Sequence, residues 1–142
     1  NDPGQGGTAL DVNLNGAYHC VRAVVRGMLL RRWGRIINVS SPSARMPLAG
    51  QASYAASKAG LEGLTRALSR DLASKGVLVN AVSPGMIETE MVEGVPLEEV
   101  LKLIPARRIG KPEEVAAAVS FLLAEDAAYI TRQVICVNGG LA

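Results

Sequence analysis

A nearly continuous apolar run, Val77-Leu78-Val79-Asn80-Ala81-Val82, constrains the possible folds of this chain more than any other feature. Strands with this pattern are typical of parallel sheets that helices cover on both faces. Residues 35–40 contain a second such run, and residues 133–137 contain a third. Because helical patterns separate the three runs, the sequence predicts an α/β fold with a parallel sheet and right-handed crossovers.

Three long segments repeat apolar residues at helical spacing. The first runs from Leu10 to about Leu30, and its apolar positions step by 4, 3, 4, 3 and 4. The second covers residues 54–75 and stops at Gly76, and the third starts at Pro112. The predicted buried stripes are Leu10, Leu14, Ala17, Val21, Val24 and Met28; Leu61, Leu64, Leu68 and Leu72; and Val115, Ala118, Val119 and Leu122.

Three other segments are expected to connect or precede these elements. Residues 1–8 should form a flexible lead-in, in which Gly4-x-Gly6-x-x-Ala9 matches a loose dinucleotide-binding fingerprint. No strand precedes that fingerprint, so we reject it. Residues 31–34 should end the first helix with cations in its last turn and a stop at Gly34. Residues 86–108 lack a clean period, and we expect a mobile lid with short helices there.

Composition argues against several classes of protein. The chain has 142 residues, 49% hydrophobic and 20% charged, which predicts one core-forming domain over residues 1–142. Its net charge is +2 and its basic residues are dispersed, so nucleic-acid binding is not expected. No apolar run approaches the roughly 20 residues of a membrane span, and we expect neither a membrane partner nor a signal peptide.

The cysteines and the histidine provide few metal ligands. Two cysteines and one histidine are too few for a structural zinc site, so no metal is expected. Cys20 lies in a helical pattern and Cys136 in a strand pattern, where a buried free thiol is the default expectation. Free thiols favour a reduced, cytoplasmic setting.

Ser41, Tyr54 and Lys58 form the pattern that carries chemistry. Ser41 follows a predicted strand, and Tyr54 and Lys58 are spaced i and i+4 on one face of a predicted helix. An ammonium that reaches the phenol favours the phenolate, and so suits Tyr54 for proton exchange with a carbonyl or alcohol oxygen. The same spacing also occurs on ordinary helices, where the tyrosine is half-buried and the lysine is solvated.

The surrounding motifs strengthen the chemical interpretation. Together with Asn13-Leu14-Asn15-Gly16 upstream and Pro84-Gly85-Met86-Ile87-Glu88-Thr89 downstream, this pattern resembles the short-chain dehydrogenase/reductase family. Within that family the chain is most similar to the 3-oxoacyl-[acyl-carrier-protein] reductases and their close relatives, from Asp11 to Leu141. The resemblance implies a Rossmann-type doubly wound parallel sheet, in which ligands bind at the carboxyl ends of the strands.

The resemblance also implies an activity and roles for particular residues. The activity is NAD(P)-dependent transfer of hydride between a nicotinamide cofactor and a carbonyl or secondary alcohol, with NADP favoured over NAD. Tyr54 would be the general acid, Lys58 would favour the phenolate and bind the nicotinamide ribose, and Ser41 would orient the carbonyl oxygen. Asn13 would anchor a proton-relay water. The residues expected to contact the cofactor are Tyr54, Lys58, Pro84, Gly85, Ile87 and Thr89.

The same resemblance suggests partners. The substrate would be a small-molecule or acyl-carrier-linked carbonyl compound, as in fatty acid biosynthesis, and the protein would be a homotetramer or homodimer. Arg31, Arg32 and Lys75 are candidates for docking an acidic carrier protein, although their role as ordinary cations at helix C-termini is the preferred explanation. Their positions place them at the amino ends of the predicted strands.

The chain departs from the family pattern in two ways. The strand, glycine-rich turn and helix with which family members bind the cofactor pyrophosphate are not found in these 142 residues, so we expect only the last three strands, with an open sheet edge. This leaves an alternative: a catalytically inactive fragment or scaffold that oligomerises through its two long helices. In addition, Arg132 stands where relatives usually have glycine, which costs about 1 kcal/mol if the turn needs positive φ.

Overall fold

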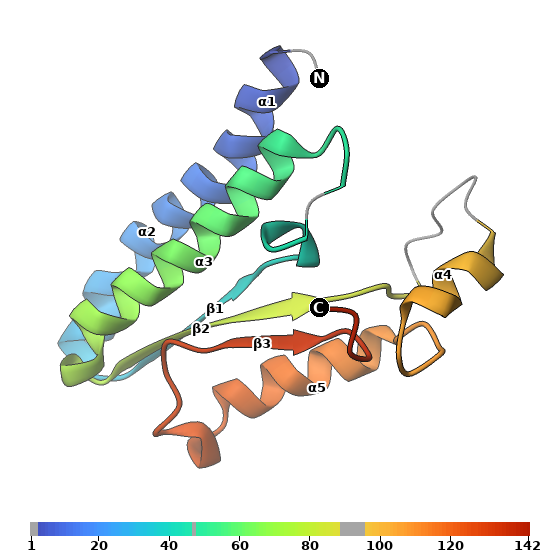
Figure 1. Cartoon of the computed structure of the whole chain (residues 1–142). Helices are drawn as coiled ribbons and strands as arrows, with labels where there is room; N and C mark the ends of the chain where they lie inside the picture. The colour runs from blue at the N-terminus through green and yellow to red at the C-terminus, as the bar shows by residue number, and fades with distance from the viewer. Residues whose placement is uncertain (1–2, 47, 89–95) are drawn as a thin grey trace.

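The computed structural model describes residues 3–46, 48–88 and 96–142, without the side chains of residues 3–6 (Figure 1). The chain begins with α1 (Pro3–Leu10), a π-helical segment η1 (Asp11–Asn15) and α2 (Gly16–Arg31). The central part contains β1 (Gly34–Val39), a 3-10 turn η2 (Pro42–Ala44), α3 (Ala52–Leu72), a 3-10 turn η3 (Ala73–Lys75) and β2 (Val77–Pro84). The last part contains α4 (Leu97–Leu103), α5 (Pro112–Leu123), a 3-10 turn η4 (Glu125–Ala127) and β3 (Val134–Val137).

The three strands form one parallel sheet in the order β1-β2-β3. Gly34 pairs with Val77 at one end of the β1–β2 ladder, and Val39 pairs with Val82 at the other. Helices α2 and α3 cover one face of the sheet and α5 covers the other, which gives three layers (Figure 1). This arrangement confirms the predicted α/β fold with a doubly wound parallel sheet.

The core follows most of the predicted apolar stripes, but the prediction was wrong for Leu10 and Val24, which are 38% and 47% exposed. Strand β2 is buried over its first seven residues, as its continuous apolar run predicts. On the α2/α3 face, Val21 and Leu72 pack with Ile36, Val77 and Val79. Leu122 of α5 is 1% exposed. Because full burial of one such side chain stabilises the fold by about 1.5–3 kcal/mol, these layers hold the strand ends in fixed positions.

The N-terminal segment differs from the prediction. We expected a flexible lead-in over residues 1–8, but residues 3–8 belong to α1, which packs against α3. This tertiary packing outweighs the low helix propensity of the glycines. The helix predicted to start at Leu10 therefore begins earlier, and the π-helical segment η1 interrupts it.

The turn after α2 also differs from the prediction. Gly34 is not the helix stop, because it is already the first residue of β1. Instead Arg32 adopts the left-handed conformation at φ 54°, and the Trp33 N–H donates to the Met28 carbonyl at 3.1 Å. After α3 and η3, by contrast, the helical stretch stops at Gly76 as predicted; Gly76 has φ 82°, and its carbonyl accepts a hydrogen bond of 3.1 Å from the Gly34 N–H. Arg132 has φ 65°, which confirms the strained turn expected from its sequence position.

The structure also bears on the expectations for the cysteines, for membrane-spanning segments and for metal ligands. Cys20 is exposed, contrary to the expectation of a buried thiol, because its side of α2 points away from the sheet; Cys136 is half-buried. Within the described ranges, no helix combines the length and apolar character needed to cross a membrane. The same part of the chain contains no group of three or more His, Cys, Asp or Glu side chains that could hold a metal ion.

Candidate active site

Ser41 lies at the carboxyl end of β1. The Ser40 N–H continues the ladder to the Val82 carbonyl at 2.8 Å, and the chain then leaves the sheet. Ser41 is extended, and its hydroxyl caps η2 by accepting a hydrogen bond from the Ser43 N–H at 3.2 Å. The cap holds the half-buried hydroxyl of Ser41 at the edge of the sheet rather than inside it.

Tyr54 and Lys58 lie in the first two turns of α3, which begins at Ala52. The Lys58 ammonium lies 5.7 Å from the centre of the Tyr54 ring, and it donates a hydrogen bond of 2.8 Å to the Val39 carbonyl. The predicted proximity is therefore confirmed, but the ammonium lies over the ring and bonds to β1 instead of to the phenol oxygen. Burial lowers the pKa of Lys58 below its ordinary value.

Asn13 is part of the π-helical segment η1 and reaches α3. Its amide nitrogen donates to the Ser57 hydroxyl at 3.1 Å, and that hydroxyl donates to the Tyr54 carbonyl at 2.7 Å. Such π-helical turns are frequent at functional sites. Asn13 therefore contacts the residue next to Lys58, while Asn15 bonds within its own helix to Asp11 at 2.9 Å.

The other predicted segment follows β2. The Gly85 N–H donates to the Val137 carbonyl at 2.9 Å, so the chain stays beside β3 as it leaves the sheet. Ile87 then pairs with Gly110, and its side chain is only 9% exposed. A ligand at this edge can therefore contact only a small part of Ile87. Thr89 lies outside the described residues.

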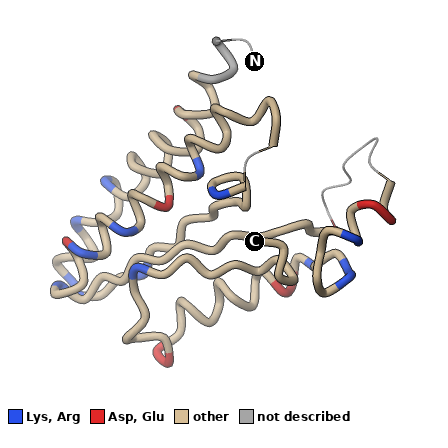
Figure 2. The backbone as a smooth tube through the Cα atoms, in the orientation of Figure 1, with Lys and Arg blue, Asp and Glu red and all other residues tan. Residues whose placement is uncertain are grey.

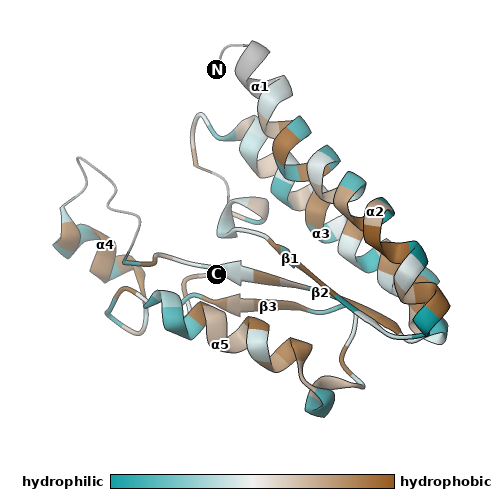
Figure 3. Cartoon of the chain, turned by 180° about the vertical axis from the view of Figure 1, so that it is seen from behind, coloured by the Kyte–Doolittle hydropathy of each residue, from teal (hydrophilic) through white to brown (hydrophobic). Residues whose placement is uncertain are grey.

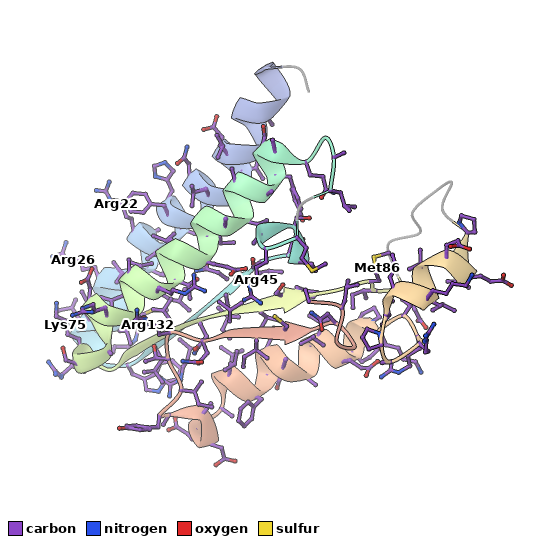
Figure 4. The ribbon with its side chains drawn as sticks, in the orientation of Figure 1. Arg22, Arg26, Arg45, Lys75, Met86 and Arg132 are labelled. Carbon is purple, nitrogen blue, oxygen red and sulfur yellow. The ribbon has the colours of Figure 1, made fainter. Side chains whose placement is uncertain are left out.

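A small pocket that the sequence did not indicate lies beside this segment. Met86, labelled in Figure 4, contributes to its lining. On the other side, the Arg108 guanidinium donates two hydrogen bonds of 2.6 Å to the Glu114 carboxylate. These bonds, with a further one from the Lys111 N–H, lower the pKa of Glu114 to about 2. The full lining is Met86, Ala106, Arg108, Gly110, Glu114, Val137, Asn138 and Gly139.

The register of the sheet brings the predicted residues to one edge. Val39 pairs with Val82, so Ser41 and Pro84 both lie two residues beyond the same rung of a parallel ladder. Tyr54 and Lys58 lie over the end of β1, since the ammonium bonds to Val39. A hydroxyl, a phenol and an ammonium therefore lie near the carboxyl end of β1.

This cluster fits part of a nicotinamide cofactor. An ammonium has three donors, and the described residues occupy one of them through Val39, which leaves Lys58 able to bind a ribose diol. Tyr54 as a whole residue is 38% exposed, so a ligand can reach it. The donor set suits a sugar hydroxyl and a carbonyl oxygen rather than a metal ion.

The basic residues considered for carrier docking lie elsewhere. Arg31 and Arg32 finish α2, and Lys75 finishes η3, so all three lie at the amino ends of the strands. Figure 2 shows blue segments gathered at this end of the molecule, where α2 and α3 finish. The Arg32 guanidinium donates to the Ser74 carbonyl at 3.3 Å, which joins the two helix ends. The patch is thus at the opposite edge of the sheet from Ser41.

Comparison with known proteins identifies the family. A family model described as enoyl-(acyl carrier protein) reductase matches residues 5–142, and the chain belongs to the short-chain dehydrogenase/reductase family. It is 49% identical over 135 residues to the 3-oxoacyl-[acyl-carrier-protein] reductase of Pseudomonas aeruginosa. The proteins of the same name from Aggregatibacter actinomycetemcomitans and Escherichia coli are 50% and 43% identical. Each alignment covers 93% of this chain and 55% of the relative, so the chain spans about half the length of these relatives.

Proposed function

We propose that the protein is an NAD(P)-dependent reductase that converts a ketone to a secondary alcohol, and that it acts on 3-oxoacyl groups linked to an acyl carrier protein. The observation that carries this proposal is the cluster of Ser41, Tyr54 and Lys58 at the carboxyl edge of β1. The names of its relatives support the substrate class. They favour a ketone over the carbon–carbon double bond that the name of the family model suggests.

Each residue of the cluster has a distinct task in this proposal. When bound, the nicotinamide cofactor supplies the hydride. Tyr54 donates its phenolic proton to the carbonyl oxygen of the substrate, and Ser41 donates a hydrogen bond that holds this oxygen in place. Lys58 contributes a positive charge beside the phenol and binds the ribose.

Other residues complete the proposed site. Asn13 anchors a water that connects Lys58 to solvent, and Pro84, Gly85, Ile87 and Thr89 contact the nicotinamide. NADP is the cofactor we favour over NAD. We further propose that residues 1–142 form the C-terminal catalytic portion of one domain, in a cytoplasmic homotetramer or homodimer.

A second candidate function comes from a different class: a scaffold that oligomerises through its helices without turnover. Large apolar side chains on the outer side of α2 favour it, since Val24 is 47% exposed and Leu30 is 79% exposed. Figure 3 shows hydrophobic residues alternating with hydrophilic ones along this helix. Exposed apolar side chains that form a patch commonly mark an interaction site.

A titration of NADPH and NADH fluorescence against the purified 142-residue chain separates the two candidates. Binding that the substitution Lys58→Met weakens supports the reductase. The absence of binding by a folded, oligomeric chain supports the scaffold. Reduction of a soluble 3-ketoester, followed by the loss of NADPH absorbance, then tests the reaction itself.

A further inference from the structure

Glu62 is a buried carboxylate one helical turn beyond Lys58 on α3. The residue is 3% exposed, and the chemistry proposed above does not use it. Its Oε2 accepts a hydrogen bond of 2.6 Å from the Ser40 hydroxyl, and its Oε1 lies 3.4 Å from the Arg45 guanidinium. The Arg66 guanidinium lies 3.7 Å from the same Oε1. Burial of a carboxylate is unfavourable unless it is paired and hydrogen-bonded, and Glu62 is both.

The two oxygens of Glu62 hold the two ends of one short segment. Ser40 immediately precedes Ser41, and Arg45 follows η2, so the carboxylate bonds on both sides of the Ser41 hydroxyl. Arg45, labelled in Figure 4, also donates to the Cys136 sulfur at 3.0 Å, which links the segment to β3. Glu62 itself belongs to the helix that carries Tyr54 and Lys58.

Further polar contacts fix the axial position of α3 on β1. Next to the Glu62–Ser40 contact, Lys58 bonds to the Val39 carbonyl at 2.8 Å, and the Asn38 amide donates to the Thr65 hydroxyl at 2.9 Å. Apolar contacts tolerate small sliding movements of a helix, whereas hydrogen bonds lose strength steeply when their geometry changes. Lys58, Glu62 and Thr65 therefore form a ladder that sets the helix against the strand.

We propose that Glu62 is a positioning residue, which sets the Ser41 hydroxyl at its working distance from Tyr54 and Lys58 by holding Ser40 and Arg45. The inference rests on the proposed reductase function for its effect on turnover. A misplacement of about 1 Å in a catalytic group can lower turnover by about 10²-fold, so a positioning residue has a measurable kinetic signature.

Four variants test the proposal in the enzyme. Glu62→Leu removes the contacts of residue 62 with both Ser40 and Arg45. Glu62→Gln keeps an oxygen that accepts from Ser40 but removes the charge that attracts Arg45, and Arg45→Met removes the same contact from the other side. Thr65→Val is the matched control, because it breaks the neighbouring rung of the ladder, at Asn38, and leaves the Ser41 segment held. If Glu62→Leu does not fold, Glu62→Gln and Arg45→Met still test the proposal, because neither removes an apolar side chain from the core.

We expect Glu62→Leu to lower kcat for ketone reduction by about 10- to 100-fold, with the KM for NADPH changed by less than about twofold. Glu62→Gln and Arg45→Met should cause smaller losses than Glu62→Leu. The double variant should lose less than the sum of the two single losses, because both substitutions break the Glu62–Arg45 contact, while Arg45→Met also removes the hydrogen bond to Cys136. Thr65→Val should lower the melting temperature but lower kcat less than Glu62→Gln does, because the Ser41 segment keeps both of its contacts with Glu62. Wild-type kcat in the Glu62 variants, or an equal loss of kcat in Thr65→Val, would overturn the proposal.

Hydrogen exchange separates this inference from the proposed function. Amides of residues 40–46 should exchange faster in Glu62→Gln and Arg45→Met than in the wild type or in Thr65→Val. If the wild-type enzyme reduces no ketone but this exchange pattern holds, the reductase function is wrong and the positioning role of Glu62 stands. If the wild type is active and the exchange of residues 40–46 is the same in all variants, the positioning role is wrong.

Discussion

At the scale of single residues, Tyr54 carries the proton in the proposed reaction, and Tyr54→Phe removes nothing but that hydroxyl. We expect kcat for ketone reduction to fall by at least about 10²-fold at saturating NADPH, because general acid catalysis contributes about 10²–10⁴-fold. Circular dichroism should show an unchanged fold, since Tyr54 is 38% exposed. Tyr18→Phe, on the exposed side of α2, is the control and should retain full turnover. A Tyr54→Phe enzyme that keeps most of its kcat would show that another group is the acid.

The charge of Lys58 has its own kinetic signature. Without a neighbouring cation the phenol keeps its proton to higher pH, so Lys58→Met should move the basic limb of the kcat/KM profile to higher pH. The same substitution should weaken NADPH binding, which fluorescence titration measures. Burial already lowers the pKa of Lys58, so its charge is lost earlier in the alkaline range than that of a free lysine. Lys75→Met, at the opposite edge of the sheet, serves as the control. If Lys58→Met does not move the basic limb of the kcat/KM profile, a different group sets that limb.

At the scale of helices and strands, the periodic patterns predicted most elements correctly. The apolar runs predicted the three strands, and the apolar stripes predicted the three long helices. Both predictions were possible because the faces that an element buries determine the spacing of its apolar residues. Packing between distant segments is not encoded in this way. Helix α1 forms in a glycine-rich stretch because α3 lies against it, and Arg32 takes a left-handed turn that sequence rules assign to glycine.

The turn at Gly76 provides a test of element geometry. Gly76→Ala should lower the free energy of unfolding by about 1–2 kcal/mol or more, because its φ is 82° and the added Cβ would strike the Arg32 carbonyl. Gly63→Ala is the matched control on exposed α3, where nothing lies within 4 Å of the added Cβ. This control should raise stability by up to about 1 kcal/mol, because alanine favours helix. Urea unfolding of both variants measures the difference, and equal effects would contradict the strain argument.

The start of α5 should respond to acid. Hydrogen bonds from Arg108 and then Lys111 lower the folded-state pKa of Glu114 to about 2 from a usual 4.5. The carboxylate therefore stabilises the fold above about pH 4.5, and this contribution disappears as the pH falls towards 2. Urea unfolding should show Glu114→Gln less stable than the wild type at pH 6, with the gap closing near pH 2. Glu113→Gln, in the same helical turn, should show no such convergence.

At the scale of the whole molecule, the sequence predicted the residues of the candidate site but not the contacts that hold those residues in position. Ser41, Tyr54 and Lys58 could be predicted, because parallel strands deliver their carboxyl ends to one edge and the i, i+4 spacing places two side chains together. The contacts of Glu62 with Ser40 and Arg45 join residues 22 and 17 positions apart, and no local period encodes such a pair. The Arg108–Glu114 pair beside Met86 was missed for the same reason, although both residues stand in short charged clusters.

The basic patch of Arg31, Arg32 and Lys75 lies at the edge of the sheet opposite to Ser41. Because substitutions there should not disturb the site itself, they test whether the substrate is linked to a carrier protein. We expect Arg32→Glu to leave kcat/KM for a small soluble 3-ketoester unchanged, since Arg32 contacts the Ser74 carbonyl and no described residue of the site. When the ketoacyl group is linked to an acidic carrier protein, docking at this patch predicts that Arg32→Glu raises the KM for this substrate. That increase should be largest at low salt, because exposed charges are screened beyond about 10 Å at 0.1 M ionic strength. Steady-state kinetics of both substrates across a salt series measure this, with Arg132→Glu as a control for general loss of positive charge at this end of the molecule. Unchanged kinetics with both substrates would exclude the patch as a docking surface and leave a reductase of small ketones.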